Sequence, residues 1–203
     1  MSTLLILGAG GHGRVVADAA LASGAWTRVI ASDRDPRRVT GELLPGVALM
    51  PLSQALAAAQ AVHVAIGQGS AREREVSALP AGLLASVIHP RASVSAHARV
   101  EPGCFVAAQA VVASLAVLGE SVIVNHGAVV DHDVEVGGYS HVAPLVALGG
   151  GVRIGRGVLL GSGASVLPGK RVGDGVVIGS GAVVVDDLTE PGVYAGVPAR
   201  RIK

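Results

Sequence analysis

The chain has 203 residues, of which 50% are hydrophobic, 15% are charged and only 2% are aromatic. The formal net charge is +1 and no run of Lys or Arg occurs, which argues against a broad binding surface for nucleic acid or anionic lipid. The single cysteine, Cys104, excludes an intrachain disulfide and a cysteine-rich zinc site, and it fits a reducing cytoplasm. The first apolar run, Leu4–Leu7, is too short for a signal peptide or a membrane span, so we expect a cytoplasmic protein without a membrane segment.

The first 85 residues alternate short apolar runs with alanine-rich helical stretches, which predicts an α/β domain. The expected elements, in chain order, are a strand at Leu4–Leu7, a helix at Arg14–Ala22, a strand at Arg28–Ala31, a helix at Leu52–Gln60 and a strand at Val62–Ile66. Strands separated by helices indicate a small parallel sheet with right-handed crossovers.

A glycine-rich segment, Gly8-Ala9-Gly10-Gly11-His12-Gly13, follows the first predicted strand and precedes the first helix. Its G-x-G-x-x-G spacing suits backbone amides that receive a phosphate at a helix N-terminus. Asp33 follows the second strand, where an acidic side chain can hydrogen-bond a ribose. A full dinucleotide fold needs two such halves and only one fits here, so a half-Rossmann domain for a nucleotide-linked sugar is favoured over an NAD site.

An aliphatic residue occupies every sixth position from Ile88 to Val184, and the next positions outward, Gly82 and Glu190, break the period. The positions are Ile88, Val94, Val100, Val106, Val112, Leu118, Val124, Val130, Val136, Val142, Leu148, Ile154, Leu160, Val166, Val172, Ile178 and Val184. Small residues lie two positions earlier, and glycine often follows directly, where we expect turns with strained φ/ψ angles. Such short strands stack into a solenoid with an aliphatic interior.

This hexad, aliphatic-Gly-x-x-small-x, resembles the repeat of the hexapeptide acyltransferases. The resemblance implies a left-handed parallel β-helix with three hexads per triangular coil, and a homotrimer with active sites between subunits. Residues 18 apart then lie above one another at about 4.8 Å, the spacing of strands in a sheet. One predicted column holds His126, Pro144, Ser162 and Ser180, and the next holds His132, Gly150 and Pro168.

Three histidines fall close together within the repeats, at His126, His132 and His141. His132 lies between Asp131 and Asp133, and a neighbouring carboxylate can fix the tautomer and raise the basicity of an imidazole, as a general base requires. A solvated surface histidine is the alternative interpretation. Zinc is disfavoured and no metal is expected, because His126 and His132 belong to different faces of one coil and should diverge.

Residues 125–133, 137–142 and 192–200 resemble the sugar acetyltransferases that include the sialic acid O-acetyltransferases and the bacterial UDP-4-amino-sugar N-acetyltransferases. By this resemblance His132 is the general base and Asp133 supports it, at a position where the family often has Glu. The residues expected to contact the co-substrate acetyl-CoA are Asn125, His141, Gly150, Ser162 and Ser180. Those expected to line the nucleotide-sugar site are Gly10, Gly11, His12, Ser32, Asp33 and Gly67, while Arg34, Arg37 and Arg38 face either the diphosphate or solvent.

The sequence therefore predicts a nucleotide-sugar-binding domain at residues 1–85, a β-helix acetyltransferase domain at 86–187 and a C-terminal tail at 188–203. The expected reaction transfers acetyl from acetyl-CoA directly to the amino group of a nucleotide-linked amino sugar. O-acetylation of sialic acid or another sugar hydroxyl is the enzymatic alternative. A non-catalytic nucleotide-sugar sensor is the alternative of another class, and an NAD-linked enzyme is a further, disfavoured one.

Overall fold

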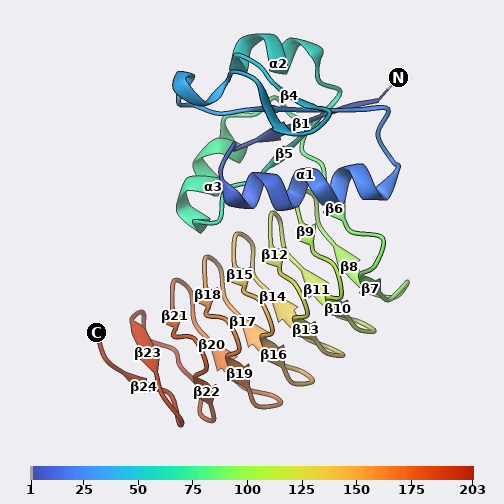
Figure 1. The fold of residues 1–203 in the computed structure, drawn as a ribbon. Helices are drawn as coiled ribbons and strands as arrows, with labels where there is room; N and C mark the ends of the chain where they lie inside the picture. Colours follow the sequence, from blue (N-terminus) through green and yellow to red (C-terminus); the bar gives the residue numbers. More distant parts are fainter. Residues whose placement is uncertain (1) are drawn as a thin grey trace. The chain divides into compact units, whose positions relative to one another are not determined.

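The computed structural model describes residues 2–203, which form two compact units, one that ends at Pro90 and one that spans Arg91–Lys203 (Figure 1). The described helices all belong to the first unit, whereas the second consists of very short strands joined by turns. None of the helices in the described part of the chain combines the length and the apolarity that a membrane crossing demands.

The first unit is built on a five-stranded sheet of order β3-β4-β2-β1-β5. The strands of the sheet are β1 (Thr3–Leu7), β2 (Arg28–Ser32), β3 (Glu42–Leu44), β4 (Val47–Leu49) and β5 (Ala61–Val64). The helices are α1 (Gly11–Ser23), α2 (Leu52–Ala58), α3 (Gly69–Ser77) and the 3-10 turn η1 (Pro36–Arg38). The last strand of the unit is β6 (Val87–Ile88). The pairs β1–β2, β1–β5 and β2–β4 are parallel, which confirms the expected Rossmann-like sheet. The antiparallel hairpin β3–β4 and helix α3 were not predicted.

Burial explains why the central strands were the easiest elements to predict. All of β1 is buried, and Leu4, Leu5 and Ile6 are completely inaccessible. A parallel strand that is covered on both faces has no solvent-facing side, so its sequence is a continuous apolar run. The hairpin β3–β4 lies at the edge of the sheet and is only partly buried, and its apolar residues form two short runs on either side of Pro45 and Gly46.

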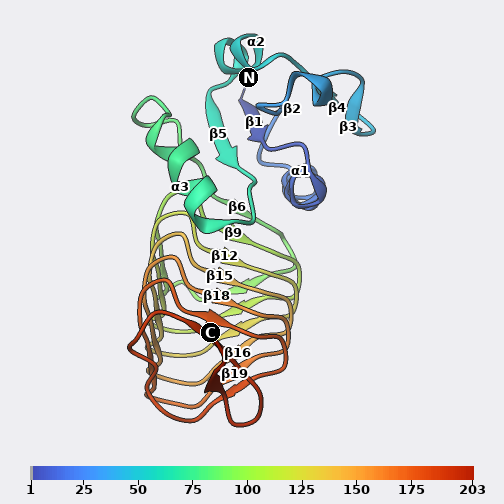
Figure 2. The ribbon, with the colours of Figure 1, turned by 90° about the vertical axis from the view of Figure 1, so that its left-hand side faces the viewer.

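The second unit is a parallel β-helix, and Figure 2 shows its coils stacked on one another. Its strands are β7 (Ser93–Val94), β8 (Arg99–Val100), β9 (Phe105–Val106), β10 (Val111–Val112), β11 (Val117–Leu118), β12 (Ile123–Val124), β13 (Val129–Val130), β14 (Glu135–Val136), β15 (His141–Val142), β16 (Ala147–Leu148), β17 (Arg153–Ile154), β18 (Leu159–Leu160), β19 (Ser165–Val166), β20 (Arg171–Val172), β21 (Val177–Ile178), β22 (Val183–Val184), β23 (Val193–Ala195) and β24 (Arg200–Arg201). From β7 to β19, each strand pairs in parallel with the strand that lies 18 residues further along.

Three sheets run along the β-helix. The first contains β7, β10, β13, β16, β19 and β22, and the second contains β8, β11, β14, β17 and β20. The strands of the third that belong to this unit are β9, β12, β15, β18, β21, β23 and β24. The chain thus turns a corner after every two-residue strand. We call the corner between the first and second sheets the His132 corner, and the corner between the third and first sheets the Ser162 corner, after a residue in each.

The aliphatic column fills the interior, as the six-residue period predicts. From Val106 to Val184 its members are at most 4% exposed, and the small residues two positions earlier, such as Ala110 and Ala128, are equally buried. The first coil is less well covered, because Val94 and Val100 are only partly buried. Apolar side chains of similar size, stacked at strand spacing, fill this column without an aromatic ring.

Where glycine directly follows an aliphatic residue of the column, it serves a different purpose from the one expected. Left-handed φ angles recur at every sixth residue, three positions after the aliphatic residue, from Gly103 (φ 77°) to Gly181 (φ 69°). The glycines directly after the aliphatic residue, such as Gly137 and Gly161, have no such angle. A Cβ at Gly137 would lie 2.5 Å from the carbonyl carbon of Gly155, so these glycines permit close stacking of the coils.

Candidate functional site

The glycine-rich loop between β1 and α1 owes its shape to its first and last glycines. Gly8 has a φ of +120°, and a Cβ there would lie 2.7 Å from the backbone oxygen of Ala65. A Cβ at Gly13 would lie 1.9 Å from the oxygen of Gly8. Gly10 and Gly11 have open space instead, so their backbone is accessible to a ligand.

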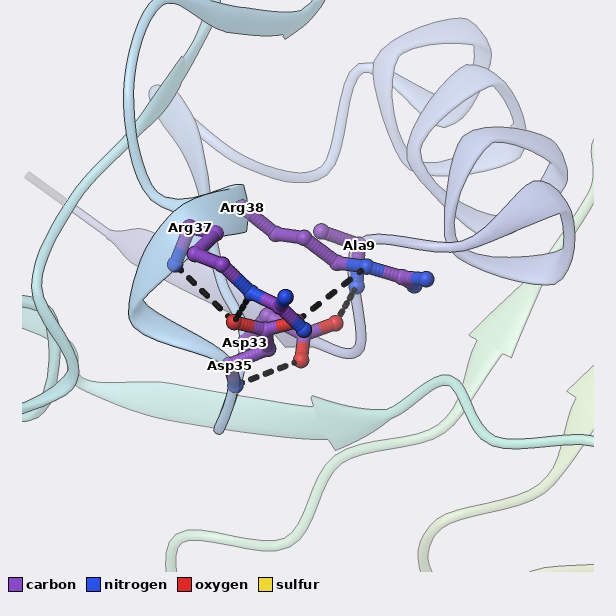
Figure 3. A network of polar contacts seen from close by, with 5 residues as sticks. All are labelled: Ala9, Asp33, Asp35, Arg37 and Arg38. Carbon is purple, nitrogen blue, oxygen red and sulfur yellow. Dashed lines mark hydrogen bonds and ion pairs between the residues drawn. The ribbon is translucent and has the colours of Figure 1, made fainter.

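Asp33 anchors this loop from the end of β2. Its Oδ2 accepts a hydrogen bond from the Ala9 amide at 2.8 Å, and its Oδ1 accepts one from the Asp35 amide at 2.9 Å (Figure 3). The neighbouring Ser32 is buried, and its hydroxyl donates to the Met50 oxygen at 2.8 Å. Both side chains therefore hold the backbone around the loop, and their contact with a nucleotide sugar stays a prediction.

A cavity of about 400 Å³ opens beside the glycine-rich loop. Its lining residues are Ala9, Gly10, Gly11, Arg14, Arg38, Thr40, Glu42, Leu43 and Leu49. Two of the predicted substrate residues, Gly10 and Gly11, thus lie in its wall. The half-buried His12, within the first turn of α1, and Gly67 are not part of the wall. The wall also contains Thr40 and Glu42, at the start of the β3–β4 hairpin, which the sequence analysis missed because no motif marks them.

The three arginines after β2 have different partners. Arg34 donates to both carboxylate oxygens of Glu75, from Nε to Oε1 at 3.1 Å and from Nη2 to Oε2 at 2.8 Å. Arg37 forms a similar pair with Asp35, at 2.9 and 2.8 Å. Arg38 lines the cavity, and its Nε is 3.9 Å from the nearer Asp35 oxygen. Only Arg38 of the three is therefore positioned to face a ligand in this cavity.

Gly67 lies in the loop between β5 and α3, where the buried side chain of Arg72 fixes the backbone. The Arg72 Nη1 donates to the oxygens of Ile66 and Gly67, at 2.6 and 3.0 Å. These hydrogen bonds restrain the loop, because breaking them would leave the buried guanidinium of Arg72 without its acceptors, which costs free energy.

In the β-helix, His132 and Asp133 form the hydrogen-bonded pair that the sequence predicts. The His132 Nδ1 is 2.8 Å from the Asp133 Oδ2. An ionised carboxylate can only accept, so Nδ1 carries the proton and Nε2 keeps a free lone pair. This bond, with the charge of Asp131, raises the pKa of His132 above its ordinary value. The His132 side chain is 63% exposed, so a substrate can reach it.

Gly150 makes room for the imidazole of His132. The two residues are neighbours in one column of the His132 corner, and the Gly151 amide donates to the His132 oxygen at 2.9 Å. A Cβ at Gly150 would lie 2.4 Å from the His132 Nε2 and 2.5 Å from its Cε1. The ring therefore lies across Gly150, one of the residues that the sequence predicts to contact acetyl-CoA.

Asn125 and His141 meet beside the Ser162 corner. The Asn125 Oδ1 accepts a hydrogen bond from the His126 amide at 2.9 Å, which fixes the orientation of the carboxamide. Its Nδ2 then points at the His141 Nε2, at 3.3 Å. Both side chains are half-buried.

The remaining predicted acetyl-CoA residues, Ser162 and Ser180, are exposed and stack at the Ser162 corner. The Gly181 amide donates to the Ser162 oxygen at 2.9 Å, which confirms the predicted 18-residue column. His126 belongs to the same corner, so it diverges from His132 as expected. Within residues 2–203 no group of three His, Cys, Asp or Glu side chains converges to hold a metal. Within one chain the predicted site residues thus form separate clusters: one at the His132 corner, one at the Ser162 corner and one around the glycine-rich loop of the first unit.

The comparisons with known proteins agree with this arrangement. The family model of the PglD N-terminal domain matches residues 3–79, and the model of the bacterial transferase hexapeptide (six repeats) matches residues 151–186. A search of curated protein sequences gave no significant match.

Solved structures are similar over the whole chain. The acetyltransferase domain of PglB from Neisseria gonorrhoeae FA1090 is 35% identical over 100% of both chains, with a TM-score of 0.92. The same domain in complex with acetyl coenzyme A is 35% identical over 98% of both chains, with a TM-score of 0.91. PerB from Caulobacter crescentus, in complex with CoA and GDP-perosamine, is 34% identical over 100% of this chain and 98% of that chain, with a TM-score of 0.91.

A half-Rossmann domain followed by hexapeptide coils, with an acid-supported histidine at a coil corner, defines a left-handed β-helix acyltransferase. The chain belongs to the hexapeptide-repeat sugar acetyltransferases that carry a PglD-type N-terminal domain.

Proposed function

We propose that the protein is an acetyl-CoA-dependent N-acetyltransferase that acts on the amino group of a nucleotide-linked amino sugar. The observation that carries this proposal is the exposed His132, whose Nδ1 is bonded to Asp133 and whose Nε2 is available as a base. The complex of PerB with CoA and GDP-perosamine and that of the PglB domain with acetyl coenzyme A supply the substrate classes.

In the proposed reaction the amine nitrogen of the sugar attacks the thioester carbonyl carbon of acetyl-CoA. A new C–N bond forms, the C–S bond breaks, and the His132 Nε2 takes the proton that the amine must lose. Asp133 keeps the ring in the reactive tautomer and stabilises the imidazolium that results. The imidazolium then returns the proton to the departing thiolate, so CoA leaves as a thiol.

The separation of the predicted site residues supports a homotrimer. His132 lies at one corner of the triangle, whereas Asn125, Ser162 and Ser180 lie at another. Residues from different corners can line one groove when the corner of one subunit packs beside a different corner of the next. A closed cyclic assembly provides such heterologous contacts three times over.

The nucleotide of the substrate belongs on the first unit in this proposal, where Gly10 and Gly11 expose their backbone to a cavity. We place the enzyme in the cytoplasm. The buried thiol of Cys104, which donates to the Gly119 oxygen at 3.1 Å, is compatible with reducing conditions.

The proposed base is tested by His132→Ala, with His97→Ala as the matched control because His97 is an exposed histidine outside the predicted site. We expect His132→Ala to lower acetyl transfer by roughly 10²–10⁴-fold, the usual contribution of a general base, and His97→Ala to change it little. Nucleotide binding and assembly should survive in both variants. Near wild-type turnover of His132→Ala would contradict the proposal.

The proposed acceptor is tested by the consumption of acetyl-CoA with a panel of nucleotide-linked amino sugars, their hydroxyl counterparts and sialic acid. Preferential use of the amino sugars is expected. Preference for a hydroxyl would establish an O-acetyltransferase instead, and nucleotide-sugar binding without any turnover would establish a sensor. Thermal stabilisation by NAD, which we do not expect, would indicate an NAD-linked protein.

A further inference from the structure

The cavity of the first unit carries charged side chains that the glycine motif does not account for. One wall is the loop Ala9–Gly11 together with Arg14, which lies in the first turns of α1. The opposite wall runs from η1 to the β3–β4 hairpin and contributes Arg38, Thr40 and Glu42, with the apolar Leu43 and Leu49. The cavity therefore has a cationic part, an anionic group and an apolar part.

The cationic part suits a diphosphate. Figure 3 shows the side chain of Arg38 extended toward Ala9 of the glycine-rich loop, whereas Arg37 folds back onto Asp35. Arg14 is exposed, and α1 has no acidic residue in its first turn. Two guanidinium groups beside accessible loop amides offer charge-assisted hydrogen bonds to several phosphate oxygens at once.

Glu42 should contact a part of the ligand other than the phosphates, because a carboxylate repels phosphate. Its Oε1 accepts one long hydrogen bond, from the Gly46 amide at 3.3 Å. Asp33, the acid that the Rossmann pattern assigns to ribose, already accepts one backbone amide at each oxygen. Glu42 is thus the carboxylate in the cavity wall with acceptor capacity for an uncharged N–H or O–H donor.

We propose that Arg14 and Arg38 bind the diphosphate of the nucleotide-linked sugar, while Glu42 accepts a hydrogen bond from the nucleoside and so determines which nucleotides the cavity takes. Leu43 and Leu49 provide the apolar surface against which a base packs. The donor to Glu42 is either a ribose hydroxyl or a base N–H. This inference rests on the proposed function for the class of ligand, a nucleoside diphosphate.

The phosphate part is tested by titration calorimetry of the full chain with GDP and UDP, without acetyl-CoA. Arg38→Ala is compared with Arg37→Ala, which removes the adjacent arginine outside the cavity. Loss of a charge-assisted bond to phosphate should weaken binding of both nucleotides by on the order of tenfold or more in Arg38→Ala. Arg37→Ala should bind within about twofold of wild type. Equal affinities of Arg38→Ala and wild type would overturn the assignment, as would a wild-type protein that binds neither nucleotide.

The nucleoside part is tested by Glu42→Gln, with Asp18→Asn on the exposed face of α1 as the charge-matched control. We expect Glu42→Gln to weaken the better nucleotide by roughly tenfold and Asp18→Asn to leave it unchanged. If Glu42 binds a ribose hydroxyl, GDP and UDP lose affinity equally, and their 2′-deoxy forms lose none when that hydroxyl is the 2′ one and lose as much when it is the 3′ one. If Glu42 binds the base, the losses differ between GDP and UDP and persist in the deoxy forms. Unchanged or tighter binding of every nucleotide in Glu42→Gln would show that Glu42 only repels phosphate, and it would overturn the proposal.

These measurements separate the cavity from the acetyl transfer itself. Binding that responds to Arg38→Ala and Glu42→Gln in a protein that never consumes acetyl-CoA would support the cavity and contradict the proposed function. Turnover of a nucleotide-linked amino sugar with a KM that neither variant changes would support the proposed function and contradict the role of the cavity.

Discussion

At the residue scale, the functional unit of the β-helix is the pair His132–Asp133. Asp133 has a φ of +58°, at the turn position where most coils carry glycine. Aspartate is among the few side chains that adopt this left-handed conformation readily, because it can form local hydrogen bonds. The turn that the coil requires thus also places a carboxylate 2.8 Å from the imidazole next to it.

The raised pKa of His132 has a consequence for the pH profile. A general base acts when it is neutral, so kcat/KM should increase with pH and level off above the pKa of His132, which lies above 6.5. Asp133→Asn removes the charge of Asp133 and weakens its hydrogen bond to His132, both of which raise this pKa, while the charge of Asp131 remains. The acidic limb of the profile should then move to lower pH, while the maximal rate falls because the tautomer is no longer fixed. An acidic limb that keeps its position in Asp133→Asn would contradict this role.

The position of the His132 ring depends on the absence of a side chain at Gly150. In Gly150→Ala the new Cβ would occupy the space of the His132 Nε2, 2.4 Å away, so the ring must move. A displaced base costs on the order of 10²-fold in kcat/KM. Gly151→Ala is the control: it meets no atom within 4 Å but has a φ of +69°, so it should lower stability by about 1 kcal/mol and spare the activity. Equal activities of the two variants would refute the contact.

Reasoning from residues identified His132 and Asp133 because they are adjacent in the chain. It could not assign Gly150 to the space beneath His132, because that contact depends on the stacking of two coils. Arg38 and Glu42 carried no signal, since surface loops of many proteins contain such residues. Only the fold of the hairpin brings them to the wall of one cavity.

At the element scale, strand β5 contains a buried titratable group. His63 is 1% exposed, and its Nδ1 donates to the Ala85 oxygen at 2.9 Å. Burial, with a smaller contribution from the charge of Arg72, lowers the pKa of His63 to about 4. The strand therefore folds with a neutral imidazole.

This neutral histidine should make the first unit sensitive to acid. Unfolded His63 binds a proton near its ordinary pKa of 6.5, whereas the folded form stays neutral down to about 4. The unfolded state thus holds more protons within this window, and stability that is complete above pH 6.5 decreases by about 3 kcal/mol as the pH falls through it. Denaturant titrations followed by the fluorescence of Trp26, the single tryptophan, report the unfolding of this unit.

His63→Gln serves as the control, because glutamine can still donate to Ala85 but does not titrate. The stability of the variant should retain only the pH dependence that comes from the carboxylates. The difference between its curve of unfolding free energy against pH and that of the wild type then gives the contribution of His63. Parallel curves for the two proteins between pH 6.5 and 4 would rule out the buried neutral form.

At the scale of the whole molecule, two exposed leucines stand out at the corners of the β-helix. Leu115 at the His132 corner is 61% exposed and Leu145 at the Ser162 corner is 69% exposed. Each has a φ of 61°, a conformation that is costly for leucine. Strained, exposed apolar residues are retained when another surface covers them, which favours contacts between subunits at these corners.

The proposed trimer is tested by the double variant Leu115→Asp, Leu145→Asp. Aspartate tolerates the left-handed turn better than leucine, so each chain should fold, but the charges would be buried at the subunit contact. We expect monomers in sedimentation velocity and a loss of acetyl transfer with an unchanged β-sheet circular dichroism spectrum. Gln109→Asp, an exposed residue at the same turn position with a φ of 62°, is the control and should remain assembled. A fully active monomeric double variant would contradict an active site between subunits.

The sequence by itself determined the β-helix, its 18-residue columns and the parallel core of the first unit. These features follow from local periods: one aliphatic residue in six must face inward, and a strand buried on both faces must be apolar throughout. The histidine and its acid were equally accessible, because they are neighbours in the chain.

Tertiary structure decided the features that depend on atoms far apart in sequence. It assigned the glycines after the aliphatic column to close coil stacking and the left-handed turns to a different position of the hexad. In the folded chain both carboxylate oxygens of Asp33 accept hydrogen bonds from backbone amides, whereas Glu42 lies in the cavity wall. A one-dimensional pattern records which side chains are present, but hydrogen-bond partners and steric contacts are set by the distances between elements, and these exist only in the folded chain.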